Sequence, residues 1–258
     1  MFEAHLRIPF FSKSSSSNNN QSNTSDRSFL GSSEHFEWRA AGSIDNEDWI
    51  RKNGVSFLEK VYSVYKTDIL KLGEANKLPI RVVVRPSSEC QGGIAGATGD
   101  GDLSYCAGNW ASNGFCYGIL AHELCNLFTG ERVTAGWPTA WWANHRSPFP
   151  TMIANQALRK IVPEYYRRWG DYNDPLVVMF ERLYDDYPGM FPRMFQKMRE
   201  LSVGLARFED PYLSHVVYYF MFYGAGRQIS NYFIAPPMPP VNPTTIMEIE
   251  SKFKLGII

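Results

Sequence analysis

The sequence lacks several features that mark common protein classes. Its four cysteines include no Cys-x-x-Cys pair, which argues against a disulfide scaffold or a zinc ribbon and favours a reducing compartment. Basic and acidic residues number 26 each, so no excess of one charge favours nucleic acid as a partner. The longest apolar run, residues 216–223, is far shorter than the roughly 20 residues that cross a bilayer.

A secretory signal is also missing from the first residues. Glu3 interrupts the apolar start of the chain, and the next apolar run covers only residues 8–11. We therefore expect a cytoplasmic location by default, with no membrane span. The 44% of hydrophobic residues and 15% of aromatic residues are typical of a globular protein with a well-filled core or an aromatic-lined cleft.

Composition divides the chain into three parts. Residues 1–35 contain serine and asparagine runs that bury too little apolar area to order, so they are predicted to be a disordered tail. Residues 36–235 are predicted to form one domain. Residues 236–258 begin with several prolines, which indicate a stiff linker, and end in a short helix over 244–255.

The order of predicted elements indicates an α+β domain with a small sheet and many helices. Helical spacing of apolar residues predicts a first helix over 46–72, and β-branched residues predict strands at 80–84 and 103–107 around a glycine-rich stretch. Further helices are expected at 114–129, 151–169, 175–203 and 211–231.

The helix over 114–129 carries the functional prediction. On a helical wheel its apolar stripe consists of Leu120, Leu124, Leu127 and Phe128. His122 and Asn126 are four residues apart and fall together on the opposite side, with Cys125 at their flank. This polar pair lies on a solvated surface or lines a cleft.

The run His122-Glu123-Leu124-Cys125-Asn126 resembles the HExxH motif of the zincin-like metallopeptidase superfamily. In that motif two histidines at i and i+4 hold Zn²⁺, and the glutamate acts as the general base for a metal-bound water. The resemblance implies a zincin-like fold: a small mixed sheet, the active-site helix and a mainly helical C-terminal lobe. It also implies a zinc-dependent hydrolase of peptides or proteins in which Glu123 activates water and His122, Asn126 and His145 are the candidate metal ligands.

Alternatives follow from the incomplete motif, because an asparagine stands where the second histidine is expected. Cys125 is another candidate ligand, three residues from His122. The chain would instead be a catalytically inactive zincin-like binding protein if the metal is lost. A cysteine hydrolase is the third reading: Cys116 lies in the first turn of the helix, where the dipole favours a thiolate, and His145 would be its base. The sequence does not indicate the oligomeric state.

Overall fold

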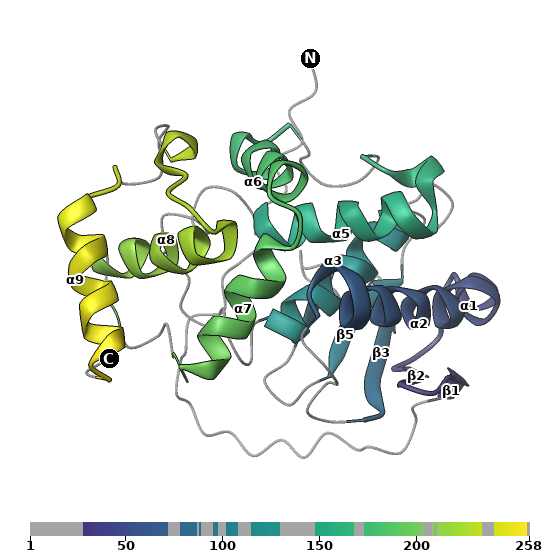
Figure 1. Cartoon of the computed structure of the whole chain (residues 1–258). Coiled ribbons are helices and arrows are strands. Elements are labelled where there is room, and N and C mark those ends of the chain that lie inside the picture. The colour runs from purple at the N-terminus through teal and green to yellow at the C-terminus, as the bar shows by residue number, and fades with distance from the viewer. Residues whose placement is uncertain are drawn as a thin grey trace.

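A computed structural model gives the fold. It describes residues 28–71, 78–86, 88, 95–97, 102–107, 115–129, 148–167, 173–201, 203, 208, 211–233 and 240–256. The order of elements confirms the α+β class: a small mixed sheet comes first, and a mainly helical region follows (Figure 1).

The sheet contains five described strands in the order β1-β2-β3-β5-β4. They are β1 (Ser28–Ser32), β2 (Phe36–Ala40), β3 (Ile80–Pro86), β4 (Ala95–Ala97) and β5 (Leu103–Ala107). The three central strands run parallel, and the two edge strands β1 and β4 run antiparallel to their neighbours. Both strands predicted from the sequence, at 80–84 and 103–107, are confirmed.

The first strand lies inside the segment predicted to be a disordered tail. Residues 28–32 pair with β2, and Leu30 is buried in the core. The prediction of disorder through residue 35 was therefore wrong from Ser28 onward. The serine-rich composition suggested that the loss of conformational entropy would keep this segment unfolded. Pairing with β2 compensates for that loss.

The helices of the first half lie on one side of the sheet (Figure 1). The predicted first helix is a continuous run of α1 (Glu47–Trp49), a π-helical turn (Ile50–Gly54), α2 (Val55–Val64) and a second π-helical turn (Tyr65–Ile69). Helix α3 (Phe115–Thr129) agrees with the prediction, and α5 (Pro148–Ile161) packs closely against it. A short 3₁₀ turn, Pro163–Tyr165, follows α5.

The second half consists of helices that extend away from the sheet (Figure 1). They are α6 (Pro175–Asp186), α7 (Met190–Glu200), α8 (Tyr212–Ala225), the 3₁₀ turn Ser230–Tyr232, and α9 (Pro243–Lys254). The single helix predicted over 175–203 is in fact two, because Gly189 takes a left-handed φ of 76° and redirects the chain. Within the described part of the chain, no helix has the length and apolarity that a membrane span requires.

One hydrophobic core runs through both halves, from the sheet to α9. Cys106, on β5, takes part in a disulfide bond, although the spacing of the cysteines argued against a disulfide scaffold. Disulfides persist mainly in oxidising compartments, and this bond therefore gives no support to the expected reducing one. Cys90 lies outside the described residues.

Candidate functional site

Helix α3 buries its apolar stripe and leaves its polar residues partly exposed, as the helical wheel predicted. Four residues of the stripe are 6% exposed or less: Leu120, Leu124, Leu127 and Phe128. His122, Glu123 and Asn126 are each of intermediate exposure. The polar group therefore lies at the margin of the core, where some contacts with solvent remain.

Cys125 lies on the core side of the helix. It is fully buried, close to Tyr65, whose hydroxyl donates a hydrogen bond of 2.8 Å to the backbone oxygen of Ala121. This bond ties α3 to the end of the preceding helical run, next to His122. The structure thus places Cys125 in the core, and its role as an alternative ligand stays a prediction.

His122 faces helix α5. Its Nδ1 lies 3.3 Å from the hydroxyl oxygen of Thr151, a buried residue in the first turns of α5. Burial disfavours the imidazolium and lowers the pKa of His122 from 6.5 to about 4. The ring is therefore neutral at physiological pH, the form in which imidazole binds metals or exchanges hydrogen bonds as both donor and acceptor.

Glu123 and Asn126 form a pair on the same helix. The side-chain amide of Asn126 donates a hydrogen bond of 3.1 Å to Oε2 of Glu123. The residue at the second ligand position of the motif thus interacts with the residue at the general-base position. An amide that donates to the carboxylate is a different chemical arrangement from a second imidazole beside it.

The donors on the described residues do not make a zinc site at α3. Zinc sites in proteins take three or four ligands from imidazole, thiolate and carboxylate groups. Among the described residues, His122 and Glu123 belong to no set of three histidines, cysteines or acids with metal-ligand spacing. His145, the predicted third ligand, lies outside the described residues. The structure therefore brings together His122, Glu123 and Asn126, but not a complete donor set.

Helix α5 contributes two polar residues that sequence analysis missed. Thr151 contacts His122, and Asn155 follows one helical turn later, on the same side of the helix. Asn155 is 0% exposed, and within the described structure neither its amide nitrogen nor its carbonyl oxygen has a hydrogen-bond partner. Buried polar atoms without partners are rare in proteins, and a bound water is one common way in which they are satisfied.

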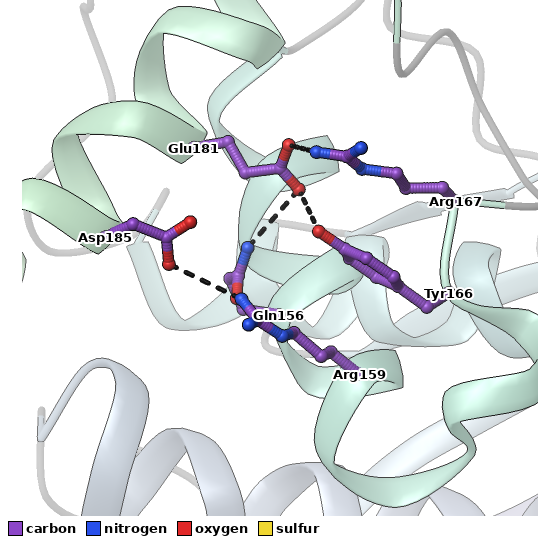
Figure 2. A network of polar contacts seen from close by, with 6 residues as sticks. All are labelled: Gln156, Arg159, Tyr166, Arg167, Glu181 and Asp185. Atoms are coloured by element: carbon purple, nitrogen blue, oxygen red, sulfur yellow. Dashed lines mark hydrogen bonds and ion pairs between the residues drawn. The ribbon is translucent and has the colours of Figure 1, made fainter.

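On another side of α5, a polar network joins this helix to α6 (Figure 2). Glu181, which is 5% exposed, accepts hydrogen bonds from Gln156 on α5 at 3.4 Å and from the Tyr166 hydroxyl at 2.7 Å, and it pairs with Arg167. Arg159 and Asp185 form a second, exposed ion pair at 3.4 Å. The buried acid thus has a structural role, and it holds in place the helix that carries Thr151 and Asn155.

Cys116 is not an activated thiol. It is fully buried, and its sulfur lies 3.3 Å from the Tyr105 hydroxyl in the core. Burial raises the pKa of the Cys116 thiol to about 12, whereas a nucleophilic cysteine requires a lowered pKa. The dipole of α3 does not overcome this desolvation, so the structure contradicts the predicted role of Cys116 as a nucleophile.

Comparison with known proteins shows a similarity of fold to a solved structure. No protein-family model matches the sequence, and no curated protein matches it. The crystal structure of a mutant of a functionally unknown conserved protein from Bacillus anthracis str. Ames is similar, with a TM-score of 0.53 and 15% identity over 84% of this chain and 50% of that one. The chain thus spans about half the length of that protein, and the likeness shows a shared fold alone.

Proposed function

We propose that this chain is a zincin-like protein that binds a peptide segment beside α3 and does not hydrolyse it. The pairing of Asn126 with Glu123 carries the proposal. In a zinc hydrolase the carboxylate at this position activates a metal-bound water. Here the carboxylate is held by an amide, at the position where the resemblance expects a second imidazole.

Two features favour a peptide as the ligand. The edge strand β4 lies against α3, and no other described strand pairs with its outer side, so an extended chain can add to the sheet there. The second feature is the polar group between α3 and α5, where Asn155 is buried and neither of its amide atoms has a partner among the described residues. His122 and Thr151 supply further polar contacts at the same helix pair.

Zinc-dependent peptide hydrolysis is the second candidate function. It is favoured by the neutral imidazole of His122 directly beside Glu123, since neutral imidazole is the form that binds zinc. On this reading Asn126 and His145 are the remaining candidate ligands.

Selection of peptides from a random displayed library separates the two functions. A selected peptide, synthesised with a fluorophore, is expected to bind the wild-type protein and to remain intact by mass spectrometry when Zn²⁺ is added. Methylation of alternate backbone nitrogens of the peptide should abolish binding, because strand addition depends on main-chain hydrogen bonds. The variant Asn155→Leu, which has the same number of side-chain heavy atoms, should also bind more weakly.

Two results would contradict the binding proposal. Zinc-dependent cleavage that is lost in Glu123→Gln supports the hydrolase instead. Failure to select any peptide, or equal binding by methylated and unmethylated peptides, removes the case for strand addition at β4.

A further inference from the structure

A second polar group lies where the turn between β1 and β2 meets α2. It consists of Glu34, His35 and Glu59, whose candidate ligand atoms all lie within 4.8 Å of one another. None of these residues takes part in the group on α3, and the inference drawn from them is independent of the proposed function.

The imidazole of His35 is held in one orientation. Its ring stacks on Tyr62 with centroids 4.1 Å apart, and its Nδ1 pairs with Oε1 of Glu59. The backbone is fixed as well: the His35 nitrogen donates to Glu59 Oε2 at 3.3 Å, and its oxygen accepts from the Ile80 nitrogen at 2.8 Å. These contacts leave Nε2 as the ring nitrogen on the side of Glu34.

The second ring nitrogen lies at a distance from Glu34 that an ion can bridge. Nε2 of His35 is 4.0 Å from Oε1 of Glu34, too long for a hydrogen bond. Ligand bonds to Zn²⁺ are about 2.0–2.2 Å in a tetrahedral arrangement, so two ligand atoms of one ion lie about 3.4 Å apart, and a small movement of Glu34 brings its oxygen to that distance. The Glu34 side chain is 84% exposed and can move closer without disturbing the core.

The charge of the group also favours a cation. Within the described part of the chain, neither Glu34 nor Glu59 forms an ion pair with a lysine or an arginine. A carboxylate on one ring nitrogen of a histidine, with a metal on the other, is a recurrent arrangement that raises the basicity of the ligand.

We propose that this group is a binding site for a divalent transition-metal ion such as Zn²⁺. Nε2 of His35 and the Glu34 carboxylate bind the ion, water completes its coordination, and Glu59 orients the imidazole through Nδ1. One imidazole and one carboxylate are two protein ligands, fewer than the three or four of catalytic and structural zinc sites, so the predicted affinity is modest. Such a site stabilises the connection between the sheet and α2.

Calorimetric titration of the metal-stripped protein with Zn²⁺ tests the site. Glu34→Gln should weaken binding at least about tenfold, because it removes a direct ligand, and Glu59→Gln should weaken it about 10–100-fold, as loss of an orienting carboxylate does. Glu164→Gln, at another exposed acid, is the matched control and should bind as the wild type does.

Nitrogen-detected NMR of histidine side chains identifies the ligand atom. Zn²⁺ is expected to shift the Nε2 signal of His35, and Glu34→Gln should suppress that shift. Equal zinc affinity of the wild type and Glu34→Gln would overturn the proposal. Absence of zinc binding, or a shift confined to other histidines, would overturn it as well.

Discussion

The side-chain amide of Asn126 lies 3.1 Å from Oε2 of Glu123, one turn along the same helix. This pair sits beside a neutral histidine whose Nδ1 contacts Thr151 of a second helix. The amide thus occupies one acceptor site of the carboxylate that would act as the general base in a zinc hydrolase. This relationship is the physical basis for proposing binding, rather than zinc-dependent hydrolysis, as the function of the α3 surface.

The stability of the metal-stripped protein should depend on the charge of His122. Its pKa is about 4 in the folded state and 6.5 in the unfolded state, so between these values the unfolded chain binds more protons. The free energy of unfolding should therefore fall as pH drops from 6.5 to 4, by up to about 3 kcal/mol. Urea unfolding across this range measures the slope, and His122→Gln should reduce it. An equal slope in the variant would show that the pKa of His122 is not lowered in the folded protein.

Asn155→Leu should stabilise the protein while it weakens peptide binding. The substitution removes two buried polar atoms that lack partners among the described residues. Relief of their desolvation is worth about 1–3 kcal/mol, and leucine has the same number of side-chain heavy atoms, although its methyl groups need more space. Urea unfolding of the free protein measures this gain. A loss of stability would mean that the amide has a hydrogen-bond partner in the folded protein. Asn155 would then not be available to a ligand.

Cys116 should resist alkylation in the native protein. With a pKa of about 12, only about one thiol in ten thousand is ionised at pH 8, and the side chain is buried. Iodoacetamide labelling followed by mass spectrometry should modify Cys116 only after denaturation. Rapid labelling at neutral pH would restore the cysteine hydrolase interpretation.

Glu181→Ala should destabilise the protein through loss of the contacts shown in Figure 2. The substitution leaves Gln156 and Tyr166 without their acceptor, and a cost of about 1–3 kcal/mol is expected for such groups. Asp185→Ala is the matched control: its ion pair with Arg159 is about half exposed, so the loss should be below about 1 kcal/mol. Thermal unfolding compares the two, and equal effects would contradict a structural role for the buried acid.

Runs of β-branched residues and the helical spacing of apolar residues were sufficient to predict some strands and helices. The β-branched run at 80–84 and the apolar stripe of the helix at 114–129 were sufficient to place β3 and α3. Strand β1 was missed because its serine-rich sequence has no alternation of its own and is ordered by pairing with β2.

The group of polar residues on α3 was only partly predictable, because some of its contacts join segments that are distant in the sequence. His122, Glu123 and Asn126 share one helix, so their spacing alone placed them together. Thr151 meets His122 across a separation of 29 residues, and no local signal marks this contact. The burial of Cys116 and Cys125 likewise depends on which helices and strands pack against α3, which the spacing of residues does not specify.

The zinc affinity of Asn126→His tests most directly the claim that α3 presents residues 122 and 126 as the active-site helix of a zincin does. If α3 presents residues 122 and 126 as a zincin-like helix does, the new histidine completes a pair of imidazoles at i and i+4 on one face. The measurement is made in the Glu34→Gln background, so that zinc at the β1–β2 turn does not contribute. The account predicts zinc binding at least about tenfold tighter than in Glu34→Gln alone, and loss of this gain when His122→Ala is added. A folded variant with no gain in affinity, or a gain that persists without His122, would contradict the account.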